Sequence, residues 1–177
     1  MTHPTSEKGY IQVYTGNGKG KSTAAFGLSL RAVGAGKKVF FCQFVKGKIY
    51  SEIDAIRQYL PNITLKQYGR GCFIYKKPEQ ADIEAAKEGL REISEIVKSN
   101  KYDLIVLDEA NIALYYNLFQ TDDLIEILRQ KHPATEVVIT GRYAPQELMD
   151  FADLVTEMKE IKHYYANGVE ARKGIEF

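Results

Sequence analysis

The 177-residue sequence contains no tryptophan and only two cysteines, Cys42 and Cys72. Two cysteines exclude a disulfide-stabilised framework, and no paired Cys/His spacing indicates a structural zinc site. No apolar run approaches the roughly 18 residues that a membrane-spanning helix requires. The polar N-terminus also lacks the apolar stretch of a signal peptide. These absences predict a soluble, cytoplasmic protein with no membrane partner.

The sequence also lacks an excess of either charge. Its 24 Lys and Arg residues are balanced by 23 Asp and Glu residues, for a formal net charge of +1. This balance argues against nucleic acid as the main partner, because polyanion-binding domains are usually clearly basic. A hydrophobic fraction of 45% and a charged fraction of 27% indicate a folded chain. We therefore expect residues 1–177 to form a single domain, with residues 1–9 flexible.

Short runs of β-branched and aromatic residues alternate with longer helical patterns along the chain. Strands are expected at 10–15, 38–45, 63–68, 103–107, 136–140 and 154–161, and helices at 21–33, 51–60, 78–99, 122–131 and 145–151. Ser51 and Thr121 are expected as N-caps of their helices. The alternation predicts an α/β fold, a doubly wound and mostly parallel sheet of about six strands with helices on both faces. Ligands bind such sheets at the carboxyl ends of the strands.

The turn after the first expected strand is rich in glycine and reads TGNGKGKST over residues 15–23. It ends like the phosphate-binding loop G-x-x-x-x-G-K-[ST]. Glycines let backbone N–H groups converge on phosphate oxygens, Lys21 supplies positive charge, and the Ser22 hydroxyl can bind Mg2+. We therefore predict a polyphosphate site formed by Gly16, Asn17, Gly18, Lys19, Gly20, Lys21, Ser22 and Thr23.

This loop departs from the usual pattern in one respect. The position five residues before Gly20 is Thr15, whereas Gly16 lies only four residues before it. The loop is therefore one residue short, or it carries threonine in the first place. The dinucleotide fingerprint G-x-G-x-x-G fits less well, because Lys21 occupies its third glycine position.

An acidic pair, Asp108-Glu109, follows the buried fourth strand. This is the usual place for the acid that completes a Mg2+ site opposite a phosphate loop. Neighbouring residues of an extended chain point to opposite sides, so one acid could reach the metal while the other braces the loop. The pattern leaves open which of the two contacts the metal.

Other strand ends carry further candidates. Arg142 follows the fifth strand and could bind a phosphate or a ribose hydroxyl, or simply be exposed to solvent. Lys46 lies in the same way at the end of the second strand. The loop after the third strand contains Phe73 and Tyr75, which either pack into the core or wall a pocket for a flat organic ligand.

Together, these residues resemble the ATP:corrinoid adenosyltransferases of the bacterial cobinamide/cobalamin type, within the P-loop nucleotidase superfamily. The resemblance covers residues 10–177 and implies a RecA-like P-loop fold. Its most specific segments are TGNGKGKSTAAFG (15–27), QFVKG (43–47), VLDE (106–109), ITGR (139–142), ADLVTEM (152–158) and the tail, which runs from KH (162–163) to GVEARKGIEF (168–177).

The resemblance implies that ATP donates its adenosyl group to the Co(I) of a corrinoid. The reduced cobalt attacks the ribose C5′ and triphosphate leaves, so ATP is held with its terminal phosphate deep in the loop. Lys19 and Lys21 would offset the charge developing on the triphosphate, as would Mg2+ held by Ser22 and Glu109. Because Co(I) is itself a strong nucleophile, no general base is needed.

The resemblance also assigns a role to the aromatic loop. In this family, aromatic residues after the third strand displace the lower axial ligand of the corrinoid, which eases reduction of Co(II) to Co(I). The family motif is Phe-x-Trp, whereas this chain has Phe73-Ile74-Tyr75. Phe73 matches, and the change to Tyr75 bears on corrinoid affinity or choice more than on the ATP site. A homodimer and a reductase that supplies the electron are further implied.

Two alternatives remain on the sequence alone. One is an ATPase or kinase on the same scaffold, in which Glu109, next to Asp108, positions water or a hydroxyl and ADP is the product; the short loop counts against it. The other is a nucleotide-binding protein without turnover. No residue excludes the second alternative, and Tyr75 keeps it open.

Overall fold

The computed structural model describes residues 8–46, 50–70 and 77–177. The strands of this part are β1 (Ile11–Thr15), β2 (Val39–Phe44), β3 (Ile63–Tyr68), β4 (Leu104–Asp108), β5 (Glu136–Thr140) and β6 (Leu154–Glu157). Its helices are α1 (Lys21–Gly34), α2 (Ser51–Tyr59), α3 (Gln80–Lys98), α4 (Ala110–Tyr115), α5 (Thr121–Arg129) and α6 (Gln146–Phe151), followed by the 3-10 helix η1 (Tyr164–Asn167).

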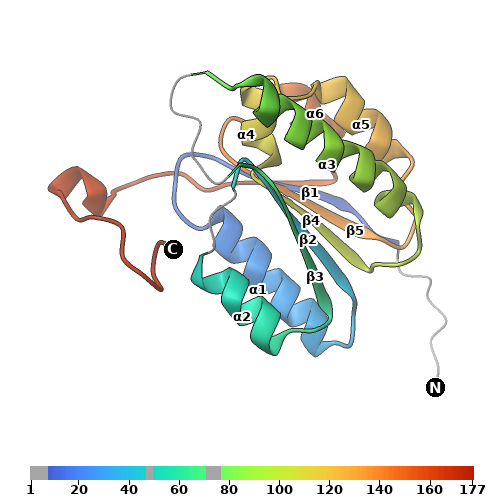
Figure 1. The fold of residues 1–177 in the computed structure, drawn as a ribbon, viewed down its shortest axis with the longest axis horizontal. Helices are drawn as coiled ribbons and strands as arrows, with labels where there is room; N and C mark the ends of the chain where they lie inside the picture. Colours follow the sequence, from blue (N-terminus) through green and yellow to red (C-terminus); the bar gives the residue numbers. More distant parts are fainter. Residues whose placement is uncertain (1–7, 47–49, 71–76) are drawn as a thin grey trace.

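The six strands form one parallel sheet in the order β3-β2-β4-β5-β1-β6. Helices α1 and α2 cover one face, and α3, α4, α5 and α6 cover the other (Figure 1). From β1 to β3 the chain crosses the sheet in one direction, and from β3 to β6 it returns in the other. Because the crossovers are right-handed, the helices of the two halves lie on opposite faces. The predicted doubly wound α/β fold is confirmed, and the sheet is parallel throughout.

Each face of the sheet carries its own hydrophobic core. Strand β2 is buried at all six positions, because helices cover it on both sides. On the α1 side, Phe26 stacks on Phe41 with ring centroids 4.1 Å apart. On the other side, the apolar stripe of α3 predicted from its three- and four-residue spacing is buried at Ala86, Leu90, Ile93 and Val97.

Several predicted boundaries were wrong. Ser51 and Thr121 are the first helical residues of α2 and α5, and the caps are Tyr50 and Gln120. The helix expected from residue 78 begins at Gln80, where the Asp82 carboxylate accepts a hydrogen bond from the Glu79 N–H. The last strand ends at Glu157, not 161, because the chain then turns across the glycine-rich loop. Helix α4 was not predicted.

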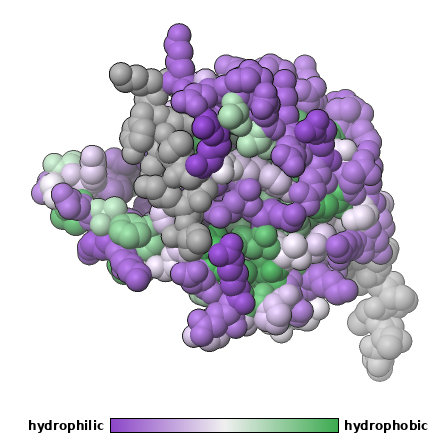
Figure 2. All heavy atoms as spheres, viewed as in Figure 1, coloured by the Kyte–Doolittle hydropathy of each residue, from purple (hydrophilic) through white to green (hydrophobic). Residues whose placement is uncertain are grey.

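The C-terminal segment after β6 extends beyond the sheet and then folds back toward the amino end of α1 (Figure 1). Hydrophobic residues lie on this projecting segment and in a separate patch below the middle of the same face, among mainly hydrophilic residues (Figure 2). Ile161 and Tyr165 are its most exposed large apolar side chains. Among the described residues, no helix is long and apolar enough to cross a membrane.

Candidate active site

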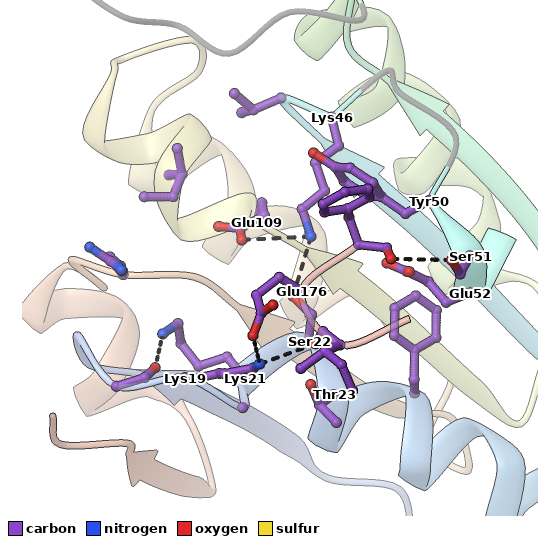
Figure 3. Close-up of a pocket in the computed structure, with 18 of the residues that line it drawn as sticks. Lys19, Lys21, Ser22, Thr23, Lys46, Tyr50, Ser51, Glu52, Glu109 and Glu176 are labelled. Carbon is purple, nitrogen blue, oxygen red and sulfur yellow. Dashed lines mark hydrogen bonds and ion pairs between the residues drawn. The ribbon is translucent and has the colours of Figure 1, made fainter. Parts of the chain in front are cut away.

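A cavity of about 720 Å3 opens at the carboxyl end of the sheet. The glycine-rich loop and the start of α1 form its floor, and the ends of β2, β4 and β5 form its back. The C-terminal segment forms another wall. Figure 3 shows how these side chains face one another. The lining residues that concern the chemistry are Lys19, Lys21, Ser22, Lys46, Glu109, Arg142, His163 and Glu176.

The glycine-rich loop begins at Gly16. Thr15 is the last residue of β1, and its hydroxyl accepts a hydrogen bond from the Ala144 N–H at 3.2 Å. Gly16 and Gly20 have φ angles of 96° and 121°, which favour glycine over any other residue. The loop between strand and helix is therefore short, with Thr15 belonging to the strand.

The segment after β6 supports the loop from behind. The Gly18 N–H donates to the Met158 carbonyl at 2.6 Å, and the Met158 N–H donates to the Thr15 carbonyl at 2.8 Å. A Cβ atom at Gly16 or Gly18 would lie 2.5 or 2.6 Å from that Met158 oxygen. These glycines thus permit backbone to lie directly against backbone. This contact gives the ADLVTEM segment a structural role.

Replacing Gly18 with alanine should distort this contact. We expect a loss of about 1–3 kcal/mol in stability, as for other overpacked sites, and weaker ATP binding. Gly27→Ala is the matched control, because Gly27 lies in α1 with no neighbouring atom within 4 Å of the added Cβ. That control should gain about 0.5–1 kcal/mol. Thermal unfolding and ATP titration measure both; equal behaviour of the two variants would contradict the proposed contact.

Lys21 is the first residue of α1, and its side chain reaches back into the glycine-rich loop. Only 8% of the residue is exposed, and its Nζ donates to the carbonyls of Gly16 and Gly18 at 2.7 and 2.6 Å. Burial lowers the pKa of Lys21, while the nearby Glu109 opposes that shift. The ammonium is thus preorganised beside the loop, where a phosphate group can replace the carbonyls as its partner.

Lys19 is turned toward the C-terminal segment. Its Nζ lies 2.7 Å from the Glu176 carboxylate, 3.0 Å from the Tyr164 hydroxyl and 3.1 Å from the Ile175 carbonyl. Arg172 and Lys19 hold the pKa of Glu176 well below its usual range. Sequence reasoning placed Lys19 at the site but did not predict this carboxylate partner, which is 157 positions away in the chain.

The two acids at the end of β4 have different surroundings. Asp108 is fully buried, and its Oδ1 accepts from the Thr140 hydroxyl at 2.6 Å. Its Oδ2 accepts from Lys46 at 2.9 Å and from Gln43 at 3.1 Å. Burial alone would raise the pKa of Asp108, but Lys46 and the hydroxyl donors Thr140 and Ser22 outweigh it and lower that pKa. Asp108 therefore braces the strand ends.

Glu109 instead faces the cavity. Its φ of 59° is left-handed, which turns the chain from β4 into α4, and its N–H donates to the Thr140 hydroxyl at 3.1 Å. Burial, together with the negative charge of Asp108, raises the pKa of Glu109. Asp108, the last residue of β4, thus points into the protein, and the left-handed turn at Glu109 directs the second acid toward the ligand space.

The remaining predicted residues divide into two groups. Arg142 is exposed and lines the cavity, beside Gly141, whose carbonyl accepts from the Asn111 amide at 3.0 Å. Phe73 and Tyr75 lie outside the described residues. Aromatic side chains that sequence reasoning did not assign also line the cavity, namely Phe26, Tyr50, Tyr115, Tyr116, Tyr143 and Phe177.

The parallel sheet, the loop at the amino end of α1 and the acid at the end of β4 define a P-loop nucleotide-binding protein. A solved structure supports this fold: the flagellar accessory protein FlaH from Methanocaldococcus jannaschii matches with a TM-score of 0.57. The match covers 85% of this chain and 71% of that one at 12% sequence identity, so it concerns the fold alone.

Sequence comparison identifies the family. The model of the ATP:corrinoid adenosyltransferases BtuR/CobO/CobP matches residues 7–177. A corrinoid adenosyltransferase of a Sinorhizobium species is 36% identical over the whole of this chain and 84% of its own length. One from Pseudomonas aeruginosa is 36% identical over 97% of this chain and 85% of its own length. The chain belongs to the ATP:corrinoid adenosyltransferase family, and it is an enzyme of that type.

Proposed function

We propose that this enzyme transfers the 5′-deoxyadenosyl group of MgATP to the Co(I) of a corrinoid and releases triphosphate. The observation that carries this proposal is the short, preorganised loop with Lys21 buried inside it. This geometry suits a triphosphate held whole as the leaving group. Cobalt attacks C5′ of the ribose, the C5′–O bond breaks, and its electron pair departs with the triphosphate.

The described residues fit a Mg2+ ion that arrives with its nucleotide. No cluster of three or more His, Cys, Asp or Glu residues suited to a metal occurs in this part of the chain. The Ser22 hydroxyl and the Glu109 carboxylate instead face the same cavity. Mg2+ usually binds one or two protein groups together with substrate phosphates and water. When bound, the ion would neutralise charge on the departing triphosphate.

The two loop lysines would share this work unequally. Lys21 exchanges the carbonyls of Gly16 and Gly18 for phosphate oxygens and stabilises their charge at close range. Lys19 has to leave Glu176 before it can pair with the triphosphate. Arg142 lies where it can bind a phosphate or the ribose. No residue is required as a general base, because the nucleophile is the cobalt.

The acceptor side of the reaction remains a proposal built on the family resemblance. Phe73 and Tyr75 would contact the corrinoid and favour loss of its lower axial ligand. A reductase would supply the electron that forms Co(I), and two copies of the chain would form a homodimer in the cytoplasm. The aromatic side chains lining the cavity offer flat surfaces for the adenine or the corrinoid.

An ATP analogue with an uncleavable β–γ bond separates this function from an ATPase or a kinase. With β,γ-imido ATP, Mg2+ and chemically reduced corrinoid under anaerobic conditions, we expect the spectrum of the adenosylated corrinoid to appear. The transferase breaks only the C5′–O bond, so the modified bond does not matter. An enzyme that cleaves the terminal phosphate would be inactive with this analogue, and that result would overturn the proposal.

A further inference from the structure

The side chain of Lys46 lies among the three residues considered above as metal ligands. Its Nζ lies 2.9 Å from Asp108 Oδ2, 3.4 Å from Ser22 Oγ and 3.8 Å from Glu109 Oε1. Figure 3 shows it directed between Ser22 and Glu109. Only 14% of the side chain is exposed. An ammonium group therefore occupies the place where a cation between the loop and the acidic pair would sit.

The backbone around Lys46 is shaped to hold it there. Val45 has a φ of 62°, which is unusual for a β-branched residue, and the Lys46 N–H donates to the Phe44 carbonyl at 2.7 Å across this turn. Gly69 lies against the same backbone, since a Cβ there would be 2.7 Å from the Lys46 carbonyl oxygen. Strain of this kind persists where the surrounding structure fixes it and is concentrated at functional sites.

We infer that Lys46 is a built-in counter-ion that occupies the metal position in the nucleotide-free enzyme, so that a divalent cation binds only together with triphosphate. This inference rests on the proposed Mg2+ role of Ser22 and Glu109. Without a metal, the ammonium offsets part of the negative charge of the two adjacent carboxylates. When MgATP enters, the triphosphate oxygens give Lys46 a new anionic partner. The Lys46 ammonium then leaves its position between the loop and the acidic pair, and the metal can bind there.

The electrostatics favour this exchange over simultaneous binding. A divalent ion placed among the same oxygens would lie within a few ångströms of the ammonium, and the like charges would repel strongly in this largely buried site. Triphosphate removes the repulsion by adding negative charge next to both cations. Lys46 thus makes metal binding conditional on nucleotide, and it acts as a positioning residue for the ion.

The test measures the affinity of the protein for Mn2+ in the absence of corrinoid and turnover. The concentration of free Mn2+ is determined by electron paramagnetic resonance. Wild type should bind Mn2+ weakly by itself, and equilibrium dialysis should show that it binds the Mn2+–triphosphate complex at least about tenfold more tightly than the free ion. Lys46→Met should bind Mn2+ without triphosphate at least about tenfold more tightly than wild type. Lys66→Met is the matched control, because Lys66 lies on the neighbouring strand β3, is half exposed and pairs with Glu92 of α3; it should behave as wild type.

Two outcomes would overturn the inference. One is tight Mn2+ binding by wild type in the absence of triphosphate, which needs no variant and so does not depend on whether Lys46→Met folds. The other is a folded Lys46→Met protein whose Mn2+ affinity is unchanged while its triphosphate affinity falls, as for a simple phosphate ligand. Neither result bears on adenosyl transfer itself, which the analogue experiment tests separately.

Discussion

Replacing Lys21 with alanine is expected to lower the rate of adenosyl transfer by about 100- to 1000-fold, the usual cost of losing one preorganised group that stabilises developing charge. The Lys21 ammonium already lies within the loop, held by the Gly16 and Gly18 carbonyls, so its side chain needs little reorganisation when triphosphate binds. Stability should change little, because the pKa of Lys21 is lowered by burial and its charge is therefore unfavourable in the empty site. Steady-state kinetics and thermal unfolding provide the two measurements.

Lys19→Ala is the matched control for this prediction. Lys19 lies in the same loop, but its side chain is 41% exposed and bound to Glu176 in the free protein. Because an exposed ion pair is worth little and must be broken before catalysis, we expect a loss of no more than about tenfold. Activity that falls more in Lys19→Ala than in Lys21→Ala would show that the loop lysines have been assigned the wrong way round.

The second large effect separates the two acids of β4. Asp108→Asn removes the closer of the two carboxylates that pair with the largely buried Lys46 ammonium, so we expect a loss of about 3 kcal/mol. For a chain of this size, that corresponds to a fall of about 6–12 °C in Tm. Glu109→Gln should leave Tm unchanged or slightly raised, because the raised pKa of Glu109 means that its ionised form is disfavoured in the fold at neutral pH.

Mg2+ dependence provides the complementary readout. Glu109→Gln should increase the Mg2+ concentration needed for half-maximal turnover by at least about tenfold, because a charged metal ligand is lost. Asp108→Asn should show a smaller change in Mg2+ dependence once measured at a temperature where the variant is folded. If Asp108→Asn alone altered the Mg2+ requirement, Asp108 rather than Glu109 would be the metal ligand.

The phosphate loop could be predicted from the sequence because its signal is local. Glycines, a lysine and a serine at fixed spacing between a strand and a helix determine the geometry of that turn. The acidic pair could also be located from the sequence, because it directly follows a buried apolar strand. Which acid faces inward depends on Gln43 in β2, Lys46 just after β2 and Thr140 in β5. Local spacing carries no information on that choice.

What could not be predicted depends on distant contacts. The approach of Glu176 to Lys19 joins the two ends of the chain, and the turn at Val45 opposes the preference of a β-branched residue. Capping rules pointed to Ser51 and Thr121, yet the preceding residues are the caps. The last strand stops early because Met158 is used to support the loop, a demand that only the folded structure reveals.

The most direct test of the proposed chemistry is the stoichiometry of products from MgATP and chemically reduced corrinoid under anaerobic conditions. The proposed cleavage of the C5′–O bond predicts one intact inorganic triphosphate for each adenosylated corrinoid formed, and no phosphate product when corrinoid is omitted. ADP and inorganic phosphate appearing at the same rate with or without corrinoid would contradict it and would establish an ATPase on this fold.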